Sequence, residues 1–358
     1  MSKRDIFIKE SEADDYQRRV LNRRAVDGGS LIVRGCAGSG KSLIAFWHLH
    51  DIVSNAKGSA QVIVFTKSLK EYFIEGCREA EIDAGLIDYY QNWERHPRQT
   101  DYILVDEAQD FSRESIEKFR RYANKALLLY GDSSQQIYGF RGEKNPQDAP
   151  IDMEEIQRIT RFPVEQLTYN HRLPKKIARL AEHLNAENDD LTGRCRNEGD
   201  EKPYVLEYAS LDEQLDAIVD IIRKKQLDDV GILLYKNEQV RDVARILGEK
   251  NLGVEAKYRI SKYQENNNLN FATTNPKVMT YHSAKGMQFG AVFLPACDSH
   301  TSIKKEDFQE FLKVFYVALT RSYQSLYVLY SGQLPTVLQG IPEELYESDL
   351  RGRETELL

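Results

Sequence analysis

The stretch SLIVRGCAGSGKSL, residues 30–43, decides the fold. The apolar run over 30–34 has the character of a buried strand, and a helix is expected over 41–55. The glycine-rich segment between them has the spacing of a phosphate-binding loop, in which backbone N–H groups turn toward phosphate oxygens. Lys41 is then expected at the β- and γ-phosphates of ATP, and Ser42 as a ligand of Mg²⁺. The alternative, a glycine-rich turn with an incidental lysine, is disfavoured by the strand–loop–helix context.

Outward from this loop, short apolar runs alternate with longer helical patterns, a rhythm typical of βαβ units and a parallel sheet. The first half predicts strands over 30–34, 61–65, 102–105 and 126–130 and helices over 41–55, 68–80, 112–124 and 133–138. The second half predicts strands over 203–208, 230–235, 276–281, 291–295 and 325–330 and helices near 173–186, 210–225, 238–250 and 305–319. We therefore expect two α/β lobes joined within 143–166, with polar surface loops over 185–202 and 264–275.

Length and composition agree with this architecture. A chain of 358 residues suffices for about two domains of roughly 150 residues. Hydrophobic residues make up 41% and charged residues 29%, which excludes a disordered or disulfide-stapled chain. The net charge of −7 excludes a strongly cationic coat but leaves room for a local basic groove. Residues 341–358 hold six acidic residues against two arginines and are expected to form an acidic tail.

The cysteines and the apolar runs indicate the compartment. The four cysteines are scattered without a CxxC pattern, so we expect reduced thiols rather than a zinc site or disulfides. The first fifteen residues become charged too early for a signal peptide. The longest apolar runs are far shorter than the roughly 20 residues that a membrane-spanning helix needs. We therefore expect a cytoplasmic protein with no membrane partner.

Two further segments follow predicted strands. Asp106 and Glu107 come directly after the apolar run 102–105, where Asp106 is suited to hold Mg²⁺ through its water shell and Glu107 to polarise an attacking water. A solvated strand end is the alternative for an isolated acidic pair. The polar segment 131–142 follows the next strand and is suited to sense a γ-phosphate. Its Phe140 and Arg141 offer a ring and a cation to nucleic acid, or a contact between the lobes.

In motif content and motif order the chain resembles superfamily 1 helicases of the UvrD/Rep/PcrA branch, over about residues 15–345. The segments that carry the resemblance are VRGCAGSGKS (33–42), VFTKSLKEY (64–72), LVDEAQDF (104–111), GDSSQQIYGFRG (131–142), LTYNHRLPKKIARLA (167–181), VGILLYKNEQVRDVARIL (230–247), TYHSAKGMQF (280–289) and FYVALTRSYQSLYV (315–328). The resemblance implies a P-loop NTPase fold of two tandem RecA-like lobes, each a mostly parallel sheet flanked by helices. The expected bounds are 1–165 for the N-terminal lobe, 166–340 for the C-terminal lobe and 341–358 for the tail.

The resemblance also implies roles for individual residues. At the nucleotide it implies Gln17 and His171 at the adenine, Gln288 at the ribose, and Gly35, Ala37, Gly38, Ser39, Gly40, Lys41 and Ser42 at the phosphates. The implied catalytic residues are Lys41, Asp106, Glu107, Gln135, Arg172 and Arg321, with Ser42 and Asp106 at the metal and Arg321 as the arginine finger. The residues implied to face single-stranded nucleic acid are Phe140, Arg141, Thr280 and His282.

The chain departs from the family pattern at two site positions and at two intervals. His171 stands where the family usually has tyrosine, and Gln288 where it has glutamate. The family carries an accessory domain between the motifs at 64–72 and 104–111 and another before 280–289. Here those intervals are only 74–101 and about 257–276. The segments 89–98 and 257–263 interleave cations with aromatic rings, which suits either a grip on a nucleic-acid strand or ordinary amphipathic packing.

Two functions remain open from the sequence. The first is an ATP-hydrolysing helicase or translocase on single-stranded nucleic acid, expected to be DNA with RNA as an alternative, moving 3′→5′ as the resemblance implies. The second is a nucleotide-gated switch subunit that controls a partner such as a nuclease, in DNA repair or anti-phage defence, without unwinding by itself. The complete set of motifs motivates the first function, and the short intervals and the acidic tail motivate the second as an alternative. A small-molecule kinase is disfavoured by the paired carboxylates and by the second lobe.

Overall fold

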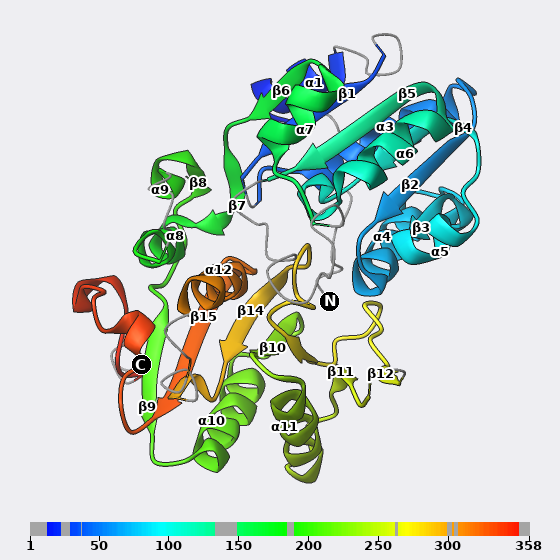
Figure 1. Ribbon diagram of the computed structural model, residues 1–358. Helices are drawn as coiled ribbons and strands as arrows, with labels where there is room; N and C mark the ends of the chain where they lie inside the picture. The colour runs from blue at the N-terminus through cyan, green and yellow to red at the C-terminus, as the bar shows by residue number, and fades with distance from the viewer. Residues whose placement is uncertain are drawn as a thin grey trace. The chain divides into compact units, whose positions relative to one another are not determined.

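The computed structural model describes residues 13–22, 29–36, 38–132, 149–184, 190–261, 264–298, 303 and 307–350. Contacts divide the chain into two compact units, Met1–His171 and Arg172–Leu358. Each unit contains a mostly parallel sheet flanked by helices, which confirms the predicted fold class (Figure 1). No helix in the described part of the chain is long and apolar enough to span a bilayer.

The first unit is a six-stranded parallel sheet in the order β3-β2-β4-β5-β1-β6. Its strands are β1 (Leu31–Gly35), β2 (Ala60–Val64), β3 (Ile87–Tyr89), β4 (Thr100–Val105), β5 (Ala123–Gly131) and β6 (Val164–Leu167). Its helices are α1 (Asp15–Asn22), α3 (Lys41–Ser54), α4 (Lys67–Glu79), α5 (Tyr90–Arg95), α6 (Arg113–Tyr122) and α7 (Met153–Thr160). Side-chain caps fix several helix starts: Thr66, Ser112 and Asp152 accept backbone N–H groups of the first turns of α4, α6 and α7.

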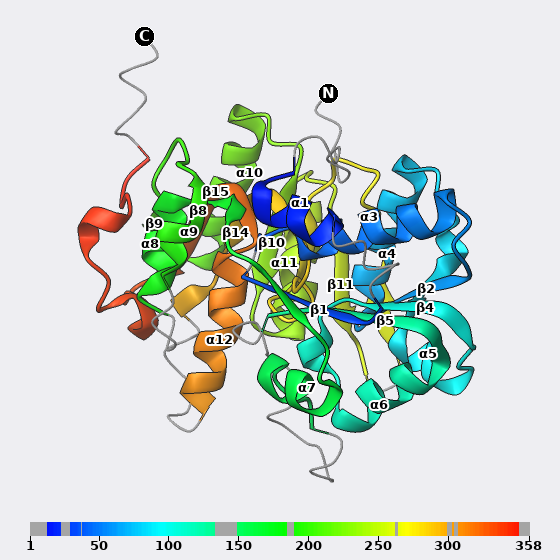
Figure 2. The same ribbon diagram turned by 90° about the horizontal axis from the view of Figure 1, so that it is seen from above.

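Both faces of this sheet are covered. Along β1, Leu31 and Val33 join the core beneath α1, α3 and α4, whereas Ile32 joins the core beneath α5, α6 and α7. Figure 2 shows the sheet nearly edge-on, with the first three helices on one side and the other three on the opposite side. A strand buried on both faces has no polar alternation, which explains the continuous apolar runs within β1, β2, β4 and β5.

The second unit is a seven-stranded sheet in the order β12-β11-β13-β10-β14-β15-β9. Its strands are β9 (Tyr204–Tyr208), β10 (Val230–Leu234), β11 (Glu255–Arg259), β12 (Glu265–Asn267), β13 (Lys277–Thr280), β14 (Phe289–Leu294) and β15 (Ser322–Ser331), and β12 alone is antiparallel to its neighbour. Its helices are α8 (Lys175–Glu182), α9 (Leu191–Arg194), α10 (Leu211–Lys224), α11 (Asn237–Glu249) and α12 (Phe308–Leu319). A small separate sheet pairs β7 (Asn170–Pro174) with β8 (Cys195–Asn197).

In the second unit, α10 and α11 pack on one face of the sheet. Leu215 of α10 and Val243 of α11 join the core on one face, and the C-terminal segment adds Leu350 to it. That segment also follows β9 along its edge, where the N–H of Val205 donates to the carbonyl of Glu347 at 2.9 Å. Residues 341–350, expected as part of an acidic tail, are therefore bonded to the second unit.

The two segments expected as loops contain regular structure, so that expectation is wrong in part. The segment 185–202 holds α9 and β8, and 264–275 holds β12. The accessory-domain intervals hold short elements only: 74–101 contains the end of α4, β3 and α5, and the described part of 257–276 contains the β11–β12 pair and the loop after it. The helix expected over 133–138 lies outside the described residues.

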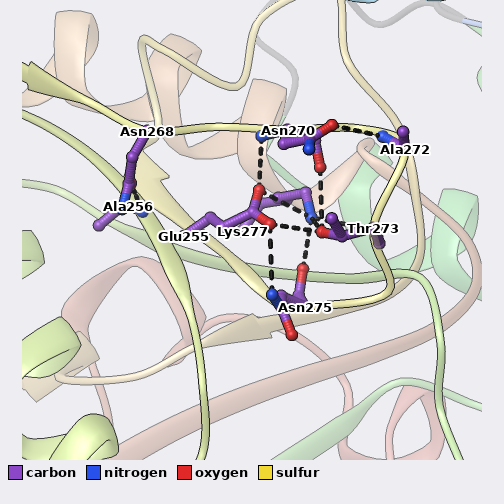
Figure 3. Close-up of polar contacts among 8 residues, drawn as sticks. All are labelled: Glu255, Ala256, Asn268, Asn270, Ala272, Thr273, Asn275 and Lys277. Atoms are coloured by element: carbon purple, nitrogen blue, oxygen red, sulfur yellow. Dashed lines mark hydrogen bonds and ion pairs between the residues drawn. The ribbon is translucent and has the colours of Figure 1, made fainter.

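The loop between β12 and β13, residues 268–276, is stabilised by a buried ion pair of Glu255 and Lys277. The Glu255 carboxylate accepts the N–H of Asn270 at 2.5 Å and the Lys277 ammonium at 3.1 Å, and it also accepts the Thr273 hydroxyl (Figure 3). Lys277 further donates to the carbonyl of Asn275 at 2.5 Å. Burial alone would raise the pKa of Glu255, but the hydroxyl, the amide and the ammonium together hold this pKa below its usual range.

Candidate nucleotide site

The phosphate-binding loop leaves β1 at Gly35 and enters α3 at Lys41. Gly38 and Gly40 have φ of +75° and +89°, backbone angles that residues other than glycine rarely adopt. Gly40 occupies the N-cap of α3, and within the described residues no side chain caps this helix start. The first N–H groups of α3 are therefore available to an anion, and the helix dipole favours negative charge at this point.

The polar side chains of the loop fit a bound phosphate group. The Lys41 side chain is buried, and its ammonium donates to the carbonyls of Gly35 at 2.8 Å and Cys36 at 3.1 Å. The Ser39 hydroxyl is buried and lacks a hydrogen-bond partner among the described residues. The Lys41 ammonium and the Ser39 hydroxyl could both donate to phosphate oxygens, so these two donors suit a bound nucleotide.

The two residues expected at Mg²⁺ are in direct contact. The Ser42 hydroxyl donates to Asp106 Oδ2 at 2.7 Å, and Asp106 Oδ1 accepts the N–H of Glu107 at 3.0 Å. Burial, and then the neighbouring Glu107 carboxylate, raise the pKa of Asp106 to about 7. The Ser42 hydroxyl and the buried Asp106 carboxylate lie side by side, and both are oxygen ligands that Mg²⁺ prefers. The pair therefore fits the ion that the resemblance implies.

Glu107 lies at the carboxyl end of β4 in a left-handed backbone conformation with φ of +54°. Its carboxylate accepts the side-chain N–H of Gln109 at 2.5 Å, and Gln109 Oε1 accepts the N–H of Asp132 at 3.0 Å. Gln109 is fully buried and so joins the expected catalytic carboxylate to the end of β5. Sequence reasoning gave Gln109 no role, although its place two residues after Glu107 was the available signal.

Asp14 bonds to both residues expected at the adenine, Gln17 and His171. Asp14 and Gln17 form a reciprocal capping box at the start of α1, with bonds of 2.7 and 3.0 Å, and Gln17 Nε2 also donates to the Ser39 carbonyl at 3.1 Å. The second carboxylate oxygen of Asp14 pairs with the His171 ring. Sequence reasoning missed Asp14, although the spacing Asp14-x-x-Gln17 is a capping-box signal.

In the second unit, Arg321 is buried at the end of α12. Its guanidinium donates to the carbonyl of Val317 at 2.8 Å, the carbonyl of Met287 at 3.4 Å and the Thr320 hydroxyl at 3.1 Å. Gln288 follows Met287 in the chain, so the segments 280–289 and 315–328 meet within this unit. Arg172 lies on β7, and its carbonyl accepts the Asn197 side chain at 2.8 Å.

The residues expected at nucleic acid are only partly described. Thr280 ends β13, and its hydroxyl is 3.1 Å from that of Ser283. His282 is half-buried two residues further on, and burial, with the Lys285 charge, lowers the pKa of its ring. The remaining site residues expected from the sequence, Ala37, Gln135, Phe140 and Arg141, lie outside the described residues.

Several described residues of the two aromatic and basic segments, 89–98 and 257–263, are engaged in packing. Trp93 is fully buried, and Tyr90 contacts Phe111 edge-on at 5.0 Å between ring centroids. Lys257 lies buried on β11. The structure thus favours amphipathic packing over a nucleic-acid grip for these described positions.

Comparisons with known proteins place these motifs in a family context. Residues 83–147 match the UvrD/REP helicase N-terminal domain, and residues 257–333 match the UvrD-like helicase C-terminal domain. A probable DNA helicase of Mycoplasma pneumoniae is 30% identical over 64% of this chain and 43% of its own length. The ATP-dependent DNA helicase PcrA of Staphylococcus epidermidis is 27% identical over 46% of this chain and 23% of its own length.

The chain therefore spans less than half the length of these curated relatives. A solved arterivirus helicase, nonstructural protein 10, is similar over 90% of this chain and 63% of its own, with 17% identity and a TM-score of 0.45. The two family matches fall one in each unit and include the segments with Asp106, Glu107 and Arg321. The two family matches confirm the resemblance to the UvrD/Rep/PcrA branch of superfamily 1 helicases: each unit contains a segment that matches a UvrD-like helicase domain.

Proposed function

We propose that this chain hydrolyses ATP and uses the energy to move along single-stranded nucleic acid as a helicase-like translocase. The observation that carries the proposal is the contact between Ser42 and Asp106 beside the phosphate-binding loop, with Glu107 next in the chain. A hydroxyl and two carboxylates thus lie at the carboxyl edge of a parallel sheet, where such sheets bind ligands, and this supports a role for them in binding a metal and activating water. The relatives named DNA helicases support DNA as the nucleic acid.

The residues of the first unit supply the phosphate chemistry. Lys41 and the N–H groups at the start of α3 would bind the β- and γ-phosphates, with Ser42 and Asp106 holding Mg²⁺. When bound, Mg²⁺ neutralises phosphate charge and fixes the phosphate oxygens in place. Glu107 accepts a proton from a water molecule while the oxygen of that water attacks the γ-phosphorus. The bond between the γ-phosphorus and the bridging oxygen breaks, and this oxygen leaves with ADP. Gln109 holds the Glu107 carboxylate in position for this transfer.

The second unit would complete the site during closure of the two lobes. We assign Arg172 and Arg321 to the transition-state charge and Gln135 to sensing of the γ-phosphate, as the resemblance implies. Arg321 would have to exchange its carbonyl and hydroxyl partners for phosphate oxygens, so its engagement would be coupled to a rearrangement at Met287. The proposed movement is 3′→5′, with Phe140, Arg141, Thr280 and His282 along the strand.

A second candidate function is a nucleotide-gated switch that controls a partner such as a nuclease. The observation that favours it is the content of the two intervals in which larger family members carry accessory domains. Residues 74–101 hold β3, α5 and the end of α4, and the described part of 257–276 holds a three-residue strand beside β11. Such a switch would bind and hydrolyse ATP with the same residues and would unwind little by itself.

One set of assays separates the proposals. ATP turnover is measured alone, with single-stranded DNA and with single-stranded RNA, and Lys41→Ala serves as the inactive control. Stimulation by DNA together with unwinding of a 3′-tailed duplex supports the translocase. Turnover without duplex unwinding supports the switch, and a wild-type chain with no ATP turnover under any condition contradicts both.

A further inference from the structure

The segment 168–174, here called the connector, leaves β6 and runs through β7 across the boundary between the units. It begins beside the phosphate-binding loop, because β6 pairs with β1 in a register that sets Gly35 opposite Leu167. A Cβ added to Gly35 would lie 2.9 Å from Leu167 Cβ, so the backbones of the two strands approach closely. The start of the connector is therefore fixed to the start of the loop.

Asn170 continues this contact one step further along the loop. Its side chain is fully buried, and its Cγ would lie 2.9 Å from a Cβ added to Gly38. The next residue, His171, donates its backbone N–H to the Gly38 carbonyl at 3.2 Å. The Asn170 carboxamide thus lies directly on the Gly38 α-carbon, and Gly38 cannot move toward the connector without displacing it.

A second set of contacts joins the connector to the loop through α1. The His171 ring pairs with Asp14, which is bonded to Gln17, and Gln17 donates to the Ser39 carbonyl. Gln17 Nε2 would also lie 2.6 Å from a Cβ added to Gly40. The connector therefore contacts the loop directly at Gly38 and indirectly at Ser39, and its next residue in the chain is Arg172.

We propose that Asn170 is a positioning residue that couples the conformation of the phosphate-binding loop to the connector. Phosphate oxygens that bind the loop reorient its backbone N–H groups, and the buried Asn170 side chain passes this displacement of Gly38 to residues 170–172. The inference rests on the proposed ATP hydrolysis. It assigns to Asn170 a role in turnover and in connector conformation, whereas nucleotide affinity depends on Lys41 and the start of α3.

The test compares Asn170→Ala and Asn170→Ser with Thr168→Ala, a matched change at a half-buried position on the same connector. Three quantities are measured on the full chain: affinity for the Mg²⁺ complex of a non-hydrolysable ATP analogue, kcat for ATP, and amide hydrogen exchange of peptides covering 168–174 with and without the analogue. In the wild type, the analogue should change exchange across the connector.

In Asn170→Ala, affinity should stay within roughly threefold, kcat should fall about 10- to 100-fold, and the exchange response should disappear, because small misplacements near a site cost rates of this size. Asn170→Ser should recover part of the response, and Thr168→Ala should behave as wild type. If Asn170→Ala loses its far-UV circular dichroism, Asn170→Ser carries the same three measurements.

Three outcomes would overturn the inference: an unchanged connector in the wild type on binding the analogue, an intact response in the folded Asn170 variants, or a loss of affinity that matches the loss of kcat. The last outcome would make Asn170 part of the binding loop itself. A wild-type chain that neither binds the analogue nor hydrolyses ATP contradicts the proposed function instead, and so the two failures are distinguishable.

Discussion

Glu107 combines an unfavourable backbone conformation with an expected catalytic role. Its φ of +54° is left-handed, which costs a non-glycine residue on the order of 1–2 kcal/mol. The conformation persists because the Glu107 N–H is bonded to Asp106 and its carboxylate to Gln109. Strain held in place by buried hydrogen bonds is a feature of functional sites, and it supports the assignment of Glu107 as the base.

Glu107→Gln should abolish ATP turnover while the chain still binds ATP. The amide has the same shape but cannot accept a proton, so hydrolysis should slow by about 10²- to 10⁴-fold, the range of general base catalysis. Steady-state phosphate release and analogue binding by titration check the two halves of this prediction. Turnover close to that of the wild type would show that another group activates the water.

Arg321→Ala should spare nucleotide binding and slow hydrolysis by about 10³-fold or more, the scale of an arginine finger. The guanidinium also bonds to Val317, Met287 and Thr320, so its loss should lower the stability of the second unit. Arg321→Lys keeps the charge but loses the fork of donors. A near-wild-type rate in a folded Arg321→Ala variant would remove the assignment.

The site residues expected from the sequence belong to contiguous motifs, and within the same motifs Gln109 and Asn170 were assigned no role. Lys41, Ser42 and Glu107 are marked by local spacing next to predicted strands. Local spacing places Gln109 beside Glu107, but it does not show that Gln109 also bonds to Asp132 after β5 or that Asn170 packs on Gly38. Their roles needed the arrangement of the sheet.

At the scale of elements, the long apolar strands were predictable and the short polar ones were not. Strands β1, β2, β4 and β5 follow the apolar runs closely because each is buried on both faces. By contrast, β12 is the three-residue run Glu265–Asn267 without an apolar residue, and it is a strand only because β11 pairs with it. Pairing at a sheet edge depends on the partner strand more than on the sequence of the edge strand.

The stability of the second unit should depend on the buried ion pair between Glu255 and Lys277, which holds the loop after β12. Lys277→Met leaves the Glu255 carboxylate buried without its cation, and breaking a buried pair in this way typically costs about 3–5 kcal/mol. Urea unfolding followed by circular dichroism measures the loss. As a control, Lys250→Met removes an ammonium that pairs with Asp212 and Asp216 at the surface, and it should leave the unfolding midpoint nearly unchanged. Equal effects of both substitutions would contradict a special role for the buried pair.

For the whole molecule, each unit has its own core, and the two cores should respond differently to acid. In the first unit His48 is buried against the Tyr130 hydroxyl at 2.6 Å, and burial lowers the pKa of His48 to about 4 from 6.5. Between these pH values the unfolded chain binds a proton at His48 that the folded unit does not, so the contribution of His48 lowers stability as pH drops through this window. The raised pKa of Asp106 in the same unit acts in the opposite sense, because there the folded unit holds a proton that the unfolded chain lacks. In the second unit the pKa of Glu255 is depressed, so its contribution persists until pH falls below about 4.5.

The contribution of His48 is therefore measured by comparing the wild type with a variant that lacks the imidazole ring. Both tryptophans of the chain, Trp47 and Trp93, are buried in the first unit, so tryptophan fluorescence follows that unit alone. The urea midpoint of the wild type, measured by fluorescence, should fall relative to that of His48→Leu as pH is lowered from 6.5 to 4, because leucine carries no charge at any pH. The same pH dependence of the midpoint in both proteins would contradict this role of His48.

The β11–β12 pair offers a point at which the chain could grow. Arg259 and Glu265 are paired across the antiparallel ladder, so the two chain ends that would flank an inserted module lie about one strand spacing apart, roughly 5 Å. Closing a long excursion between two such fixed ends costs little more entropy than closing a short one. A whole domain whose termini lie close together could therefore enter between these residues without changing the register of the sheet. The hairpin thus gives protein engineering a defined insertion site between Arg259 and Glu265.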